Sequence, residues 1–188
     1  MVVDVPEAID SDLGLLYLAH THVPTFWTER NIQLERLEWS RRADGALNIE
    51  RRLPNGISFT VEVDPTRDGV RMSFTLTNGT DRTLTKLKMN PCVLLKGAKG
   101  FDQQTNENKF LRKPFAGCRS AEGNRWVITA WKDCRTVVAN ATCPCMHSHP
   151  TLPECDPGKT VLARGWLSFY EGTDIESELR RLENVMWH

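Results

Sequence analysis

This sequence of 188 residues lacks net charge, long apolar runs and a basic N-terminal segment. Its 24 basic and 24 acidic residues cancel, so no overall field attracts nucleic acid or an anionic membrane surface. The longest purely apolar runs are a few residues, too short for a transmembrane helix. The first ten residues do not form a signal peptide. We therefore expect a cytoplasmic protein, or a secreted or periplasmic one if a signal peptide has been removed, without nucleic-acid or membrane partners.

The sequence also lacks internal repeats, low-complexity segments and an alternation of helices with strands. Instead, apolar and polar residues alternate with period two over residues 57–63 and 70–76. Asn55-Gly56 and Asp68-Gly69 provide turns before these segments. Four or five strands at roughly 10–13-residue spacing are typical of an antiparallel sandwich or barrel. The sequence thus predicts an all-β fold, an antiparallel β-sandwich of jelly-roll or related type, in a single domain over residues 1–188.

Other segments complete this expected layout. Residues 1–12 are predicted to be an N-terminal arm, residues 13–22 a buried strand and residues 96–123 a long polar connection. Thr173-Asp-Ile-Glu176 is a capping box that predicts a short C-terminal helix over 174–186. Its expected apolar stripe consists of Ile175, Leu179, Leu182 and Met186.

Cysteine and histidine gather in the stretch Cys143-Pro-Cys-Met-His-Ser-His-Pro150, followed by Cys155. In a straight strand these side chains would line one face over roughly 20 Å, whereas zinc ligands lie about 2.0–2.3 Å from the ion. The prolines favour an irregular path. We therefore expect a curled loop that gathers two or three of these groups, with Cys143, Cys145, His147 and Cys155 as candidate ligands.

Three interpretations of this loop stay open. The first is a thiolate and imidazole metal site, structural or catalytic. The second is a disulfide from Cys155 to Cys143, Cys145 or Cys134, with a Cys143–Cys145 bridge disfavoured by disulfide geometry. The third is ordinary buried cysteines beside solvent-facing histidines.

A second His-x-His element, His20 and His22, lies near the end of the predicted strand 13–22. On a strand the two side chains face the same way, so both can reach one ion; two half-exposed histidines at a strand end are the alternative. First and late strands of a sandwich are commonly neighbours, so His20, His22 and His147 are candidate ligands of one joint site. Glu29 or a cysteine would be the fourth ligand, and the donor set suits Zn²⁺ or another transition metal.

Two resemblances bear on this site. Gly14-x5-His20-x-His22 resembles the first half of the cupin metal motif, which implies a metal role for both histidines. The family's glutamate should follow four or five residues later, whereas Glu29 follows seven later, and the second cupin motif is absent.

The wider layout resembles the galactose-mutarotase-like β-sandwiches, a superfamily of sugar epimerases, lyases and sugar-binding domains. The resemblance rests on the histidine-rich strand running into Phe26-Trp27 and on the segment 75–84. The stretch 165–176 also resembles uncharacterised bacterial proteins. The mutarotase-like resemblance implies carbohydrate as the ligand.

Together these features predict a metal-binding β-sandwich protein that acts on or binds carbohydrate or another small polar ligand. Metal-assisted hydrolysis, lyase or isomerase chemistry would use Glu29 or Glu107 as general base. The predicted substrate-binding residues are Lys109, Arg125, Trp27 and Trp131, although tryptophans of a sandwich also fill cores. The alternative is a non-catalytic binding module with a structural zinc or disulfide staple at the Cys/His loop. A homo-oligomer is compatible with either function.

Overall fold

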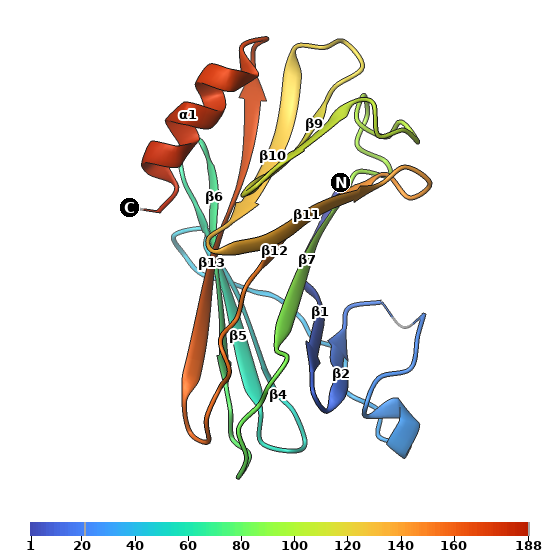
Figure 1. Ribbon diagram of the computed structural model, residues 1–188, viewed down its shortest axis with the longest axis vertical. Coiled ribbons are helices and arrows are strands. Elements are labelled where there is room, and N and C mark those ends of the chain that lie inside the picture. The colour runs from blue at the N-terminus through green and yellow to red at the C-terminus, as the bar shows by residue number, and fades with distance from the viewer. Residues whose placement is uncertain (21, 188) are drawn as a thin grey trace.

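The computed structural model of the chain describes residues 1–20 and 22–187. Thr21, within the predicted strand 13–22, lies outside the described residues. Two antiparallel sheets face each other (Figure 1). Sheet A, in spatial order, consists of β11 (Cys134–Asn140), β12 (Cys145–Pro150), β7 (Lys88–Leu94), β1 (Val2–Ser11) and β2 (Gly14–Leu18). Sheet B consists of β3 (Ser40–Arg41), β4 (Leu47–Arg52), β5 (Ser58–Pro65), β6 (Gly69–Thr77), β13 (Thr160–Glu171), β10 (Arg125–Trp131), β9 (Phe115–Arg119) and β8 (Lys109–Arg112). The predicted all-β sandwich is therefore confirmed.

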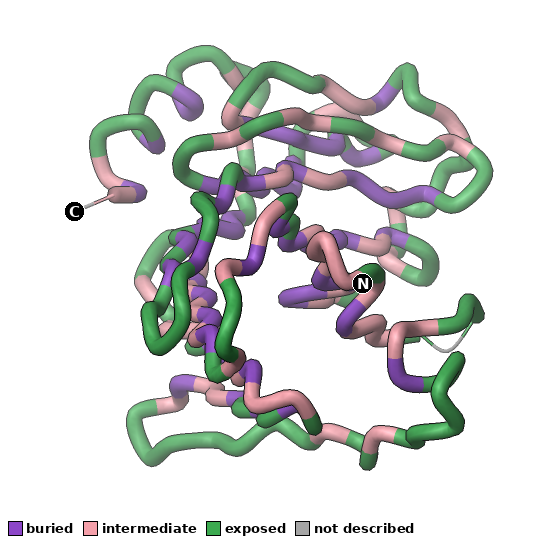
Figure 2. The backbone as a smooth tube through the Cα atoms, turned by 60° about the horizontal axis from the view of Figure 1, so that its bottom comes forward, coloured by how far each residue is buried: buried purple, intermediate pink, exposed green. Residues whose placement is uncertain are grey.

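The main hydrophobic core lies between the two sheets. Sheet A contributes Ile9, Met89 and Met146, and sheet B contributes Phe59 and Phe74. Buried and exposed residues alternate along the strands (Figure 2), since successive side chains of a strand point to opposite faces. One face of sheet A is thus committed to the core, and its outer face is free to carry polar groups.

The C-terminal helix is confirmed as α1 (Ile175–Val185). Its N-cap is Asp174, whose Oδ1 accepts the backbone N–H of Ser177 at 3.0 Å. Leu179 and Leu182 pack with Trp166 in a second apolar cluster, and α1 lies along β6 and β13 in Figure 1. Among the residues that the structure describes, no helix has the length and apolar character to cross a membrane.

Three predicted segments differ from the structure. Residues 1–12 are not an arm, because β1 pairs with both β2 and β7 inside sheet A. The register shift between Asp4 and Ala8 interrupts the period-two pattern that would have marked this strand. The connection 96–123 contains the β8–β9 hairpin. The Cys/His segment is not a loop, since residues 145–150 form β12.

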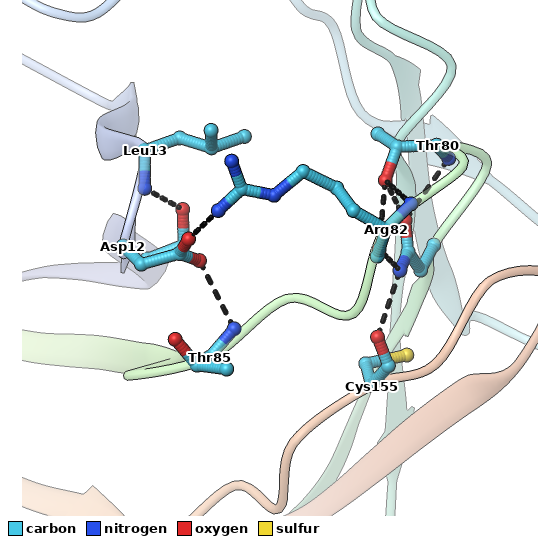
Figure 3. A network of polar contacts seen from close by, with 8 residues as sticks. Asp12, Leu13, Thr80, Arg82, Thr85 and Cys155 are labelled. Carbon is cyan, nitrogen blue, oxygen red and sulfur yellow. Dashed lines mark hydrogen bonds and ion pairs between the residues drawn. The ribbon is translucent and has the colours of Figure 1, made fainter.

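A polar network joins three connections at one end of the sandwich (Figure 3). Asp12 accepts hydrogen bonds from the Arg82 guanidinium and, at 3.0 Å, from the Thr85 N–H. The fully buried Asn78 donates to the carbonyls of Arg82 at 2.8 Å and Cys155 at 2.7 Å. The hydrogen bonds of the Asn78 side chain thus connect two of these chain segments.

Candidate metal centre

Strand β12 presents two ligand types on the outer face of sheet A. Met146 and Ser148 are fully buried on the core side. Cys145, His147 and His149 therefore share the opposite face, as alternation requires. Because a strand rises about 3.3 Å per residue, these three side chains are spread along the face. Of the three, Cys145 and His147 belong to the group that could hold a metal ion, and His149 does not.

The neighbouring strand β7 completes that cluster with Cys92. Cys145 is the register partner of Leu94 on β7, two residues from Cys92, so the two cysteines lie close on the same face. The Sγ atoms of Cys92 and Cys145 and one ring nitrogen of His147 all lie within 4.8 Å of one another. Ligand atoms around tetrahedral zinc are about 3.5 Å apart, so small side-chain rotations would bring these three to one ion.

A backbone contact orients the imidazole. His147 Nδ1 is 2.9 Å from the carbonyl oxygen of Pro91, and Nε2 is 3.2 Å from the Cys145 sulfur. With Nδ1–H donating to Pro91, Nε2 is directed at the thiols. Metal-binding histidines typically have such a backbone or carboxylate partner, because it fixes the tautomer and the ring.

The cluster also favours a deprotonated sulfur. A hydrogen bond from Cys92 and another from His147 lower the pKa of Cys145 to about 4, against the opposing effect of burial. The hydrogen bond that Cys92 donates to Cys145, followed by burial, raises the pKa of Cys92. Burial lowers the pKa of His147, but the hydrogen bond and charge of Cys145 outweigh it, and the net shift is upward. A metal cation binds to such a group by displacing the protons of its ligands.

Two further groups border the cluster. Glu7 Oε2 lies 3.9 Å from His147 Nδ1. Cys143, in the turn before β12, is exposed, and its thiol interacts with Cys145. The pKa of Cys143 is raised by burial first and by Cys145 second. Glu7 and Cys143 are thus the nearest candidates for a fourth ligand or a proton acceptor.

The structure places the other predicted metal ligands apart from this cluster. His20 Nε2 is 2.9 Å from Asp4 Oδ2. His22 is exposed and lines a groove that also contains His147. Cys155 is buried, and its backbone pairs with that of Leu84 in an isolated antiparallel β-bridge. Its sulfur lies 3.2 Å from the carbonyl oxygen of Lys159. All six cysteines are free thiols in the structure.

The predicted catalytic carboxylates lie on exposed surface elsewhere. Glu29 belongs to the short 3₁₀ helix η1 (Thr28–Arg30) and sits 4.0 Å from Arg30. Glu107 is exposed in the connection before β8. Neither lines the groove beside His147, so Glu7 is the carboxylate that the structure brings to the cluster.

The predicted substrate-binding residues have other contacts. Lys109 Nζ donates to the Thr105 carbonyl, and Arg125 pairs with Glu122 at 3.0 Å. Trp27 is 2% exposed and donates Nε1–H to the Leu16 carbonyl, and Trp131 is 0% exposed. Both tryptophans fill the core, so neither offers a face for stacking on a sugar ring.

Cys92 is the member of the Cys2His group that sequence reasoning missed. It lies in the segment 84–95, which also contains the apolar residues Met89 and Val93. Cys92 and the buried Met89 and Val93 have opposite parity, which places Cys92 on the outer face. The even position of Cys92 among odd-numbered core residues could have indicated that it faces outward. The pairing of β7 with β12, which are separated by 50 residues, could not be predicted from the local sequence.

The fold and site define an antiparallel β-sandwich with a Cys2His group able to bind a metal ion. No family model matches the chain, and no curated protein does. The Slr1438 protein of Synechocystis sp. PCC 6803 is similar in structure, with a TM-score of 0.50, 12% identity, and coverage of 72% of this chain and 66% of that one. A polysaccharide lyase matches with a TM-score of 0.49, 11% identity, and coverage of 72% and 23%. The chain thus spans less than two thirds of either protein, and at this identity the likeness shows the fold alone.

Proposed function

We propose that this chain is a metal-binding β-sandwich protein that holds one zinc ion between Cys92, Cys145 and His147 and binds or acts on a small polar ligand of the carbohydrate class. The convergence of the three ligand atoms within 4.8 Å carries the proposal. The Pro91 carbonyl supports it, because it leaves Nε2 of His147 as the nitrogen facing the sulfurs.

The donor set favours zinc. Thiolate and imidazole are the ligands of most protein zinc sites, whereas carboxylate and carbonyl oxygens suit magnesium and calcium. When bound in a site with an open position, zinc polarises a ligand oxygen or lowers the pKa of water. Glu7, 3.9 Å from the His147 ring, is placed to accept a proton from a ligand held there.

The position of the cluster favours a role in ligand binding. His147 lines a groove on the outer face of sheet A. Three protein ligands with one open position are typical of catalytic zinc, and four of structural zinc. We therefore propose that the fourth position faces this groove, where hydrolysis, elimination or isomerisation of the ligand would take place.

The first test is metal content by mass spectrometry on tag-free protein, together with a thiol count on the unfolded chain. We expect about one zinc per chain and six titratable thiols. Cys92→Ser and Cys145→Ser should each lose the zinc, whereas Cys155→Ser, a matched change of a buried cysteine outside the cluster, should keep it. Wild-type protein without metal, or zinc loss in all three variants alike, would refute the proposed site.

A structural zinc site is the second candidate, favoured by the thiol of Cys143 beside Cys145. A closed site with Cys143 as fourth ligand predicts that Cys143→Ser weakens zinc binding at least about tenfold. An open site predicts less than a twofold change. Zinc competition with a chromogenic chelator measures the difference, and the open site is abandoned if Cys143→Ser behaves like Cys145→Ser.

A further inference from the structure

A groove of about 540 Å³ lies on the outer face of sheet A beside the metal centre. Its lining includes Asp10, Lys88, Asn90, Arg135 and His149, and it shares His147 with the metal centre. This volume falls in the range of small-molecule sites. Most of its lining residues carry a polar or charged group, and the apolar ones are Ala8, Leu18 and Val138.

Strand alternation accounts for this polar lining. Lys88 and Asn90 flank the fully buried Met89 on β7, and His147 and His149 flank the fully buried Ser148 on β12. Each strand therefore directs its polar residues into the groove and its core residues away from it.

The two acidic groups of the groove already have partners. Asp10 accepts a hydrogen bond from Asn90 Nδ2 at 3.1 Å and is the cross-strand register partner of Lys88. Glu7 faces the His147 ring at 3.9 Å. Neither carboxylate is therefore available to pair with Arg135 at the other end of the groove.

That opposite end carries two side chains whose nitrogen atoms have no ion-pair or hydrogen-bond partner among the described residues. Arg135 forms no ion pair within the described part of the chain. The Nε2 atom of His149 is buried and has no hydrogen-bond partner in residues 1–20 and 22–187. A buried ring nitrogen without a partner is costly unless a ligand or water satisfies it.

We propose that this groove binds a small polyhydroxylated carboxylate, with the carboxylate between Arg135 and His149 and the hydroxyls toward Asn90 and Lys88. A guanidinium binds a carboxylate through two parallel hydrogen bonds. Both the opposite charges and the matching geometry strengthen this interaction. The inference deepens the proposed function and rests on it, because it names the ligand class that would face the metal centre.

The test compares D-gluconate with D-sorbitol, which share a carbon chain and differ in the carboxylate. Each is titrated into the zinc-loaded full chain and followed by amide chemical shifts in ¹H–¹⁵N spectra. We expect gluconate to bind at least about tenfold more tightly than sorbitol, with the largest shifts in β11 and β12. Arg135→Gln should remove that preference, whereas Lys132→Gln, which removes the same charge outside this groove, should leave it within twofold.

Zinc content measured before and after each titration separates the two proposals. A chain that holds zinc but binds neither compound, or binds both equally, overturns this inference and leaves the metal site standing. A chain without zinc refutes the metal site, and a gluconate preference that still depends on Arg135 then supports the groove alone. Equal weakening by Arg135→Gln and Lys132→Gln also overturns the inference, because it indicates general charge attraction.

Discussion

His147 Nδ1 lies 2.9 Å from the carbonyl oxygen of Pro91, one residue before the ligand candidate Cys92. The register pairs of β7 and β12 end at Val93 and Met146, so Pro91 lies beyond the paired part of the ladder and its carbonyl oxygen contacts the His147 ring. The same contact orients the histidine and connects it to the strand that carries Cys92. The candidate metal centre thus draws on two strands rather than on one loop.

His147 and His149 form a matched pair for testing this centre. They are the same residue type, two positions apart on one face of β12, yet only His147 belongs to the ligand cluster. We predict that His147→Ala lowers zinc affinity at least about 100-fold, since a direct ligand should cost no less than a residue that merely supports one. His149→Ala should change it less than about threefold. Zinc competition titrations measure both, and similar losses in the two variants would contradict the assignment of His147.

Much of the fold follows from local sequence signals. The alternating segments 57–63 and 70–76 became β5 and β6, since one apolar face fits between the two sheets. The capping box predicted the C-terminal helix, although Asp174 rather than Thr173 is its N-cap. Residues 31–39, which alternate in part, have no assigned strand in the structure. There the polar and apolar pattern alone did not specify pairing.

The candidate site depends on pairings that local signals do not carry. Proline on either side of Cys145 and His147 suggested a loop, yet β12 tolerates Pro150 at its end and Pro144 just before it. Cys92 reaches the cluster through the contact of β7 with β12, and Glu7 through the register shift in β1. Cys145 and His147, two members of the Cys2His group, were among the candidate ligands predicted from the sequence, whereas Cys92 becomes a candidate only through the sheet order.

Asn78 is predicted to be a large contributor to stability. Its side chain, 0% exposed, donates to two backbone carbonyls and accepts the Thr80 N–H at 2.9 Å. Asn78→Ala leaves those buried groups without partners, and we expect the free energy of unfolding to fall by about 2–4 kcal/mol. Asn55→Ala, which removes one turn contact at 3.2 Å, should cost less than about 1 kcal/mol. Urea unfolding compares the two, and equal losses would show that the Asn78 network contributes little.

The helix cap at Asp174 predicts a pH dependence of stability. Hydrogen bonds from the Ser177 side chain and backbone lower the pKa of Asp174 below its usual 3.8. A carboxyl with a lowered folded-state pKa stabilises the fold above its unfolded pKa, and this is lost as pH falls through the folded value. Asp174→Ala should therefore destabilise the chain at pH 7, and the difference from wild type should shrink as pH falls below 3.8.

Asp174→Asn provides the control, because an amide caps the helix without titrating. We expect it to retain most of the stability at pH 7 and to lose less stability than wild type as pH falls below 3.8, because the other carboxyls still titrate. Thermal unfolding of the three proteins at several pH values gives the comparison. A wild type and an Asn variant with the same profile would mean that Asp174 does not titrate in this range.

Zinc removal distinguishes a ligand-binding metal from a staple. Cys92, Cys145 and His147 lie on the outer face of sheet A, and the core beneath is formed by residues such as Met89 and Met146 without any metal. We therefore expect chelator-treated protein to keep its far-ultraviolet circular dichroism and to unfold cooperatively. Its free energy of unfolding should fall only by the contribution of zinc binding, which is about 2.7 kcal/mol when free zinc is at 100 times its dissociation constant. Cys145→Ser should show no stability change on chelation. If wild type instead unfolds when zinc is removed, the cluster is structural. Loss of the metal would disrupt the core only if the metal were needed to hold the strands of the sheet in place.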